Sequence, residues 1–287
     1  MGLDHAALAT WKFDEIRQSF TRKDTMLYAL GLGLGGDPTD RDELRFVYED
    51  GLQALPTMAV VLAYPGFWLK QAATGVNWRK VLHGEQSVRV FDALPVEGEV
   101  IGRQRVAALV DRGADKGAAI VVERDILDAA TGKLLCTVSG TNILRGNGGF
   151  GHSYGSLPVP HVLPERAPDR VADRKTLPQA ALIYRLSGDF NPLHADPDVA
   201  EAAGFPRPIL HGLCSFGVVG YNLMASCADG DPTRVREMRA RFSNPVFPGE
   251  TLRTEIWDEG GGTFGFRARL VERDILAVNN GVFRVET

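Results

Sequence analysis

The stretch ILHGLCSFGVVGYNLMASCA, residues 209–228, decides the fold class. It is almost wholly apolar, so it lacks the polar face that a helix lying on the protein surface needs. It is too long for a strand, and Gly212, Gly217 and Gly220 interrupt it too often for a membrane span. A helix enclosed by a β-sheet is the arrangement that fits.

Segments rich in β-branched and aromatic residues follow this run, with Gly, Asp and Asn turns between them. The first half of the chain has the same order, with residues 52–64 as a second apolar helix. The expected strands are residues 88–94, 100–111, 118–129, 134–144, 234–242, 251–259, 263–274 and 277–286. Because strands come in runs rather than alternating with helices, the fold class is α+β.

An internal repeat indicates that the chain is duplicated. The letters VERDIL occur at residues 122–127 and again at 271–276, each downstream of a Pro-Val to Gly-Glu segment, at 95–99 and 245–250. Residues 145–180 hold five prolines and five glycines, which is typical of a connector. We therefore expect three parts, with both sheets joined into one: an N-terminal repeat at 1–145, a connector at 146–180 and a C-terminal repeat at 181–287.

Composition excludes several classes of protein. The 287 residues are 44% hydrophobic and carry a net charge of −4, without the basic runs that nucleic acid or an anionic membrane requires. The three cysteines have no CxxC spacing and are expected to be buried thiols of a reducing compartment. We find no basic-apolar leader, no peroxisomal terminal tripeptide and no membrane-spanning run. We expect a soluble, cytoplasmic protein.

The candidate chemistry lies in YRLSGDFNPLHAD, residues 184–196. A regular helix would point Asp189 and His194 in diverging directions, whereas a segment broken by Gly188 and Pro192 can direct both at one water molecule. Asn191 would orient that water or a partner. The simpler interpretation is a capped turn with a structural histidine.

The pair His211-Gly212, seventeen residues after His194, goes beyond what a turn requires. Gly212 would begin the buried helix, so its free N–H could stabilise a developing oxyanion, although close helix packing would also favour glycine there. Asp189, His194 and His211 could form a metal site. Hydration of an activated double bond needs no Lewis acid, so we expect no metal, and we expect His211 to pack against or orient the Asp189 loop.

The run YRLSGDFNPLHADP followed by GFPRPILHGLCSFG resembles the signature of the type-2, or R-specific, enoyl-CoA hydratases and the related MaoC-like dehydratases. KVLHGEQSVRVFDALP and RFSNPVFPGETL extend the resemblance along the chain. It implies a tandem (double) hot-dog fold and a lyase. The implied reaction is reversible hydration of trans-2-enoyl-CoA to (3R)-3-hydroxyacyl-CoA by a water held between Asp189 and His194. Which of the two protonates C2 stays open.

The same resemblance implies that the CoA channel is lined by His83, Gly84, Phe242 and either Arg112 or Lys116. The two cations could equally be solvated turn charges, and Phe242 could be core. Coenzyme A would enter only as part of the substrate. No cofactor is expected, because GLGLGG at residues 31–36 does not open the helix of a dinucleotide-binding unit.

The first half has no histidine close behind Asp37, so only the second half is expected to be catalytic. The first half could then relax its helix and open a groove for the acyl chain, walled by residues 52–64 and 64–68. Alternatives are a hydratase of short, branched, dicarboxylic or sterol-derived acyl-CoA, a non-catalytic acyl-CoA-binding protein and, with less support, a thioesterase. The duplication leaves room for a homodimer.

Overall fold

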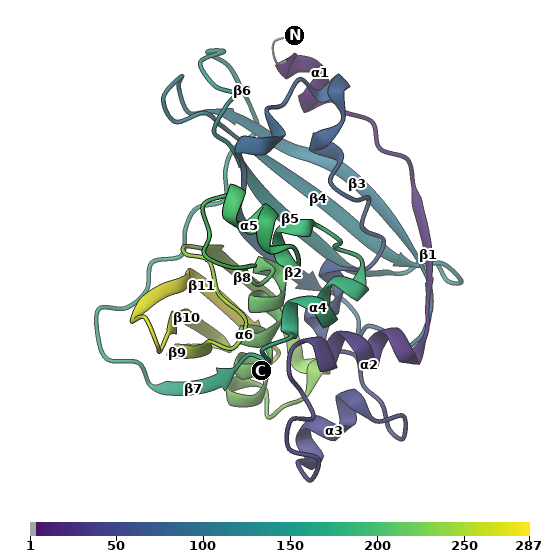
Figure 1. Ribbon diagram of the computed structural model, residues 1–287. Coiled ribbons are helices and arrows are strands. Elements are labelled where there is room, and N and C mark those ends of the chain that lie inside the picture. The colour runs from purple at the N-terminus through teal and green to yellow at the C-terminus, as the bar shows by residue number, and fades with distance from the viewer. Residues whose placement is uncertain (1–3) are drawn as a thin grey trace.

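The computed structural model describes residues 4–287, which form an eleven-stranded antiparallel sheet with helices packed against it (Figure 1). The strand order is β1-β3-β4-β5-β2-β8-β11-β10-β9-β7, and β6 pairs with β3. The strands are β1 (Ile16–Phe20), β2 (Val81–Val90), β3 (Gly98–Asp111), β4 (Ala118–Asp128), β5 (Leu134–Leu144), β6 (Ser153–Tyr154), β7 (Arg170–Lys175), β8 (Val235–Phe242), β9 (Thr251–Gly260), β10 (Thr263–Leu270) and β11 (Ile275–Val285). The α+β class is confirmed.

The helices are mostly short. The α-helices are α1 (His5–Ala9), α2 (Arg22–Gly31), α3 (Arg41–Val47), α4 (Ala180–Tyr184), α5 (Pro197–Ala202) and α6 (Gly212–Cys227). The 3-10 helices are η1 (Pro56–Val60), η2 (Trp68–Lys70), η3 (Ala72–Thr74), η4 (Trp78–Lys80), η5 (Arg185–Ser187), η6 (Pro192–His194) and η7 (Pro232–Arg234). In the described part of the chain, every helix is too short or too polar to cross a bilayer.

The two halves meet where β2 pairs with β8. This register runs from Glu85 opposite Arg241 to Arg89 opposite Glu237, and the Glu85 carboxylate accepts a hydrogen bond from Arg241 Nε at 3.0 Å. On either side of this junction the strands follow mirrored orders, so β2, β3, β4 and β5 correspond to β8, β9, β10 and β11. The predicted joining of both sheets is confirmed. The connector is partly ordered into the sheet, because β7 pairs with β9 as an edge strand.

The six-letter repeat that suggested this duplication is not a structural equivalence. Residues 122–127 lie inside β4, whereas residues 271–276 span the turn between β10 and β11. The shorter Pro-Val to Gly-Glu segments are equivalent, because each precedes the second strand of its half. The structural duplication is therefore real, but the VERDIL identity does not align it. The strand predicted at 263–274 also ends earlier, at Leu270.

Helix α6 is the predicted central helix (Figure 1). Twelve of its sixteen residues are buried. It packs on its own sheet and also against η1 of the first half. Gly220 permits this second contact, because a β-carbon there would lie 2.6 Å from Cγ2 of Thr57. Helix α6 thus joins the two halves.

The first half has no counterpart of α6, so the prediction of a long helix at residues 52–64 was wrong. The segment forms only the buried 3-10 helix η1. Pro56 can begin a helix, but Ala63 has a φ of 47° and Pro65 follows, so the chain leaves helical geometry after one short run. The apolar composition reflected burial rather than helical structure.

Candidate active site

The segment that carries Asp189 and His194 is broken twice, as its glycine and proline predict. Helix α4 continues into η5, and Gly188 ends it with a φ of 119°, a conformation that strongly favours glycine. The Asp189 carboxylate then accepts the N–H of Asn191 at 3.2 Å, and Pro192 begins η6. The chain reverses over a few residues and returns His194 towards Asp189.

His194 is 9% exposed, and its Nδ1 lies 2.8 Å from the carbonyl oxygen of Ile209. A carbonyl only accepts, so Nδ1 carries the proton and Nε2 of the neutral ring is a free acceptor. Burial lowers the pKa of His194 below its ordinary value, which favours this neutral form. His194 therefore offers a base to the space beside it.

His211 is buried directly beside His194, with ring centroids 3.8 Å apart. Its Nε2 donates to the backbone carbonyl of Asp189 at 3.1 Å, so it holds the Asp189 loop, as the sequence led us to expect. Burial first, and the neighbouring His194 second, lower the pKa of His211 to about 4. His211 is consequently an uncharged positioning residue at neutral pH.

Asp189, His194 and His211 form one cluster: an oxygen of the carboxylate and a nitrogen of each ring lie within 4.8 Å of one another. At this spacing one water can hydrogen-bond to the Asp189 carboxylate and to a ring nitrogen together. The set could also ligate a metal, since Nδ1 of His211 is buried without a hydrogen-bond partner.

Gly212 is the first residue of α6, directly after His211, so its N–H has no partner within the helix. The sixteen-residue helix directs its positive end at this position. A β-carbon at Gly212 would meet the ring of Phe242 at 3.5 Å, an ordinary contact, so packing alone does not demand glycine here. The Gly212 N–H is therefore a donor without a partner inside the helix, at the positive end of α6.

Asn191 follows Asp189 on the same loop. Its side-chain oxygen accepts the N–H of Leu193 at 3.2 Å and so caps η6. This contact is the cap that the simpler interpretation expected; the orientation of a catalytic water by Asn191 stays a prediction.

Comparison with known proteins identifies the family. The family model described as "MaoC like domain" matches residues 161–280, and "MFE-2 hydratase 2 N-terminal domain" matches residues 18–146. The chain is 40% identical over 276 residues to the peroxisomal enoyl-CoA hydratase 2 of Arabidopsis thaliana, covering 88% of this chain and 86% of that one. The chain belongs to the MaoC-like hydratase family. The expected enzyme class, a hydro-lyase, is that of this relative.

Solved structures agree with the family and the fold. The crystal structure of a MaoC-like dehydratase from Phytophthora capsici matches with a TM-score of 0.88 and 32% identity, covering 99% of both chains. A conserved hypothetical protein of Mycobacterium tuberculosis with a double hot-dog fold matches with a TM-score of 0.56 over 96% of this chain and 94% of that one. At 15% identity it supports the fold alone. The predicted double hot-dog fold is confirmed.

Of the residues predicted for the CoA channel of this MaoC-like hydratase, Phe242 lies beside Gly212 and contacts His83, which directly precedes Gly84. Phe242, at the end of β8, contacts the ring of His83 with centroids 4.9 Å apart. Gly84 sits at an irregularity in the pairing of β2 with β5, next to His83. Burial lowers the pKa of His83, although the charge of Asp189 acts on it in the opposite direction. These residues bring β2 to the reaction centre.

Arg112 and Lys116 are not part of this group. Both are exposed in the turn that joins β3 to β4. In the sheet, β5 lies between β4 and β2, the strand that carries His83. Neighbouring strands are about 4.8 Å apart, so Arg112 and Lys116 are separated from His83 by more than one strand spacing. Their charges can act only on a ligand that reaches the end of the sheet.

Two further residues near the site, Tyr184 and Arg124, were assigned no functional role from the sequence. Tyr184 is fully buried against His211, with ring centroids 5.1 Å apart. Arg124, 5% exposed, donates to the carbonyl of Val60 at 2.8 Å and lies over the ring of Tyr64, while its Nε has no partner. Burial lowers the pKa of Arg124 to about 10. No local motif marks these residues, because tertiary packing alone assembles them.

Proposed function

We propose that this protein catalyses the reversible, R-specific hydration of trans-2-enoyl-CoA. The observation that supports the proposal is the tautomer of His194: its Nδ1 donates to the carbonyl of Ile209, so Nε2 is an acceptor, and the ring lies in one cluster with the Asp189 carboxylate. We propose that the two groups share one water. Membership of the MaoC-like hydratase family supports the substrate class.

In the proposed reaction the oxygen of that water attacks C3 while the Asp189–His194 pair removes one of its protons. The pair then returns one proton to C2, so that H and OH add across one double bond. Because one cluster handles both steps, they occur on the same face of the substrate. Dehydration follows the same path in reverse.

The negative charge that develops on the thioester oxygen needs a donor, and the amide of Gly212 at the start of α6 supplies it. One such donor typically stabilises a transition state by about 2.7–4 kcal/mol, and a positioned acid or base contributes about 10²–10⁴-fold. These effects together make a metal unnecessary, and we propose a metal-free reaction.

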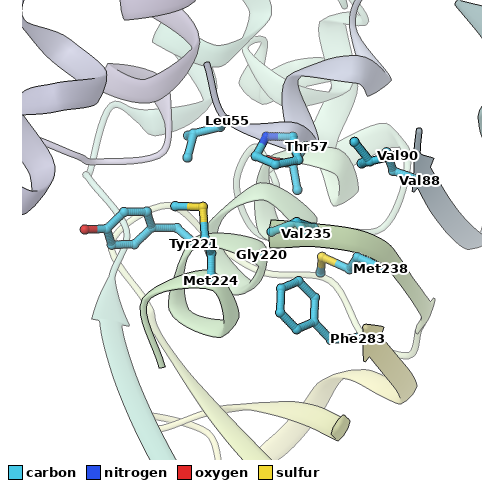
Figure 2. A pocket seen from close by; sticks show the side chains of 11 residues that line it. Leu55, Thr57, Val88, Val90, Gly220, Tyr221, Met224, Val235, Met238 and Phe283 are labelled. Carbon is cyan, nitrogen blue, oxygen red and sulfur yellow. The ribbon is translucent and has the colours of Figure 1, made fainter. Parts of the chain in front are cut away.

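We place the acyl chain in the space between η1 and α6. Figure 2 shows an apolar pocket there, formed by both halves of the molecule. Its lining residues are Leu55, Pro56, Thr57, Val88, Val90, Gly220, Tyr221, Met224, Val235, Met238 and Phe283. A second cavity of about 230 Å³ shares Pro56 and Val90 with it.

The relaxed segment 52–64 lines both cavities, which supports the hypothesis that loss of the first central helix made room for an acyl chain. The second proposed wall, residues 64–68, lines neither cavity. The first pocket is nearly closed, with a volume of about 10 Å³, so an acyl chain must displace its flexible side chains, Met224 and Met238 among them.

The decisive experiment is hydration of enoyl-CoAs of increasing acyl length, followed by loss of enoyl-thioester absorbance with chiral analysis of the product. We expect the (3R) product and a preference for chains long enough to enter the pocket. A (3S) product would refute the stereochemical assignment. Turnover restricted to short, branched, dicarboxylic or sterol-derived substrates would favour the alternative substrate class. A cytoplasmic location stays a prediction, and the Arabidopsis relative is named as peroxisomal.

A further inference from the structure

The cavity of about 230 Å³, which we call the second cavity, lies beyond the pocket of Figure 2, which we call the acyl pocket. Strand β2 and the residues after it give this order. Near the candidate site, His83 contacts Phe242. Further along, Val88 lines the acyl pocket, Val90 lines both cavities, and Leu94 lines the second one. A chain that passes through the acyl pocket therefore ends in the second cavity.

The distance along β2 sets the length of chain that reaches the second cavity. Val90 is seven residues beyond His83, and at about 3.3 Å per residue this is about 23 Å. An extended chain advances about 3.5 Å over three bonds, so about twenty bonds separate a thioester near His83 from the second cavity. A long, linear acyl group is needed to bring its far end there.

The walls of the second cavity are apolar except at two side chains. Among the described residues that line it, Gln53 and Thr233 are polar and none is charged. Thr233 Oγ1 donates to the Asp231 carboxylate at 2.7 Å, so its hydroxyl proton is already used. Gln53 Oε1 is buried and has no hydrogen-bond partner within residues 4–287. An unsatisfied amide oxygen in a cavity favours a ligand that donates a hydrogen bond.

This lining discriminates between three kinds of chain end. A methyl group fits the apolar walls but leaves Gln53 Oε1 unsatisfied. A carboxylate is repelled by this oxygen, cannot donate to it, and loses its water without gaining a cation from the lining. A hydroxyl group donates to Gln53 Oε1, and because it also accepts, it can bond to either end of the amide. The hydroxyl is the chain end that the second cavity fits best.

We propose that the second cavity binds the far end of a long, linear acyl chain that carries a terminal hydroxyl group, and that Gln53 accepts a hydrogen bond from it. The substrate class is then a trans-2-enoyl-CoA with a hydroxylated end, about twenty bonds from the thioester. Gln53 is its specificity-determining residue, far from the reacting atoms. This inference rests on the proposed function, which places the thioester near His83.

The test compares two trans-2-enoyl-CoAs of about twenty chain carbons, one with a methyl end and one with a hydroxyl end. Their kcat/KM values are measured with the wild type and with Gln53→Leu, in which an apolar side chain of similar size replaces the amide. We expect the hydroxyl-to-methyl ratio of kcat/KM to be lower in Gln53→Leu by about 2- to 12-fold, the range of one net hydrogen bond.

Two controls locate this effect in the second cavity. The same pair of substrates with about six chain carbons is too short to reach it, so the ratio should be equal in the wild type and in Gln53→Leu. Gln71→Leu makes the same substitution at an exposed glutamine that lines neither cavity, and it should keep the wild-type ratio for the long pair.

A second variant tests whether the chain occupies the cavity without changing Gln53. Ala93 is exposed at the rim of the second cavity, so Ala93→Trp fills the cavity from the surface. We expect it to lower kcat/KM for both long substrates by about 10-fold or more, the effect of about two methylene groups that lose their burial. The short pair should be hydrated as by the wild type.

Calorimetric binding of saturated acyl-CoAs with the same two chain ends gives a readout that does not depend on catalysis. We expect Gln53→Leu to weaken binding of the hydroxylated chain relative to the methyl-ended one, by the same factor as kcat/KM. Unchanged ratios of kcat/KM and of Kd would overturn the assignment of the second cavity, and so would an equal fall with the short pair. Failure of the wild type to hydrate any enoyl-CoA, with Gln53-dependent binding of the hydroxylated chain retained, would instead refute the proposed function and leave a hydroxyacyl-binding cavity.

Discussion

His211 should make the stability of this protein sensitive to mild acid. The pKa of this buried ring is lowered to about 4 from an ordinary 6.5, first by burial and second by His194. Between these two pH values the unfolded chain binds a proton that the folded protein does not. Stability therefore falls as pH falls through this window, and His211 alone accounts for about 3 kcal/mol of the loss at about 1.4 kcal/mol per pH unit.

Replacing His211 with glutamine removes this titration and keeps an amide that can donate to the Asp189 carbonyl. At pH 7.5 we expect His211→Gln to be less stable than the wild type by about 1–3 kcal/mol, because packing against His194 and Tyr184 is lost. At pH 4.5 the difference should shrink by about 2–3 kcal/mol and can change sign. Burial also lowers the pKa of His194 and of His83. Their contribution to the pH dependence of stability is present in the wild type and in His211→Gln alike.

The assay is urea unfolding, followed by tryptophan fluorescence at several pH values from 4.5 to 7.5. His152→Gln, which changes an exposed histidine, is the control and should keep the wild-type slope of stability against pH. Parallel slopes for the wild type and His211→Gln would show that His211 titrates alike in both states. That result would refute the burial argument and the neutral form of the ring.

Three further predictions concern the surroundings of the site. Arg124→Met should raise the free energy of unfolding at pH 7 by about 1–3 kcal/mol, because it removes a buried cation whose pKa is lowered to about 10. A large loss of stability in calorimetric melting would contradict this prediction. Gly212→Ala should change the free energy of unfolding by less than about 1 kcal/mol, since its β-carbon makes only ordinary contacts. It should lower kcat/KM by 10-fold or more, about 1.4 kcal/mol of barrier, because the added methyl group hinders the approach of the thioester oxygen to the N–H; equal activity would show that the oxygen does not bind there. Dialysis against a chelator should leave kcat unchanged, and activity restored only by added Zn²⁺ would place a metal at Asp189, His194 and His211.

Much of the architecture could be predicted from the sequence, because the strands and the enclosed helix have clear periodicity or composition. The failure at residues 52–64 has a physical cause: an apolar run reports burial, and only its prolines and the strained Ala63 decide that it is not a long helix. The VERDIL identity suggested an equivalence that the structure does not have, because one copy lies in a strand and the other in a turn. Six matching letters carry no information on strand register.

The features of the candidate site that depend on neighbouring residues in the sequence could be predicted. Gly188 directly before Asp189 and Pro192 before His194 both break the helix, and this can be predicted without tertiary information. The tautomer of His194 depends on a carbonyl fifteen residues away, and Tyr184 meets His211 only through packing.

The central claim is that Asp189 and His194 act on one shared water. A double-variant cycle of enoyl-CoA hydration tests it most directly, with single-turnover rates measured for Asp189→Asn, His194→Ala and the combined variant. If both groups hold the same water molecule, each single substitution should lower the single-turnover rate by about 10²–10⁴-fold. The combined variant should then be little slower than the slower single variant. A combined loss equal to the product of the two single losses would show that the side chains act independently and would contradict the account.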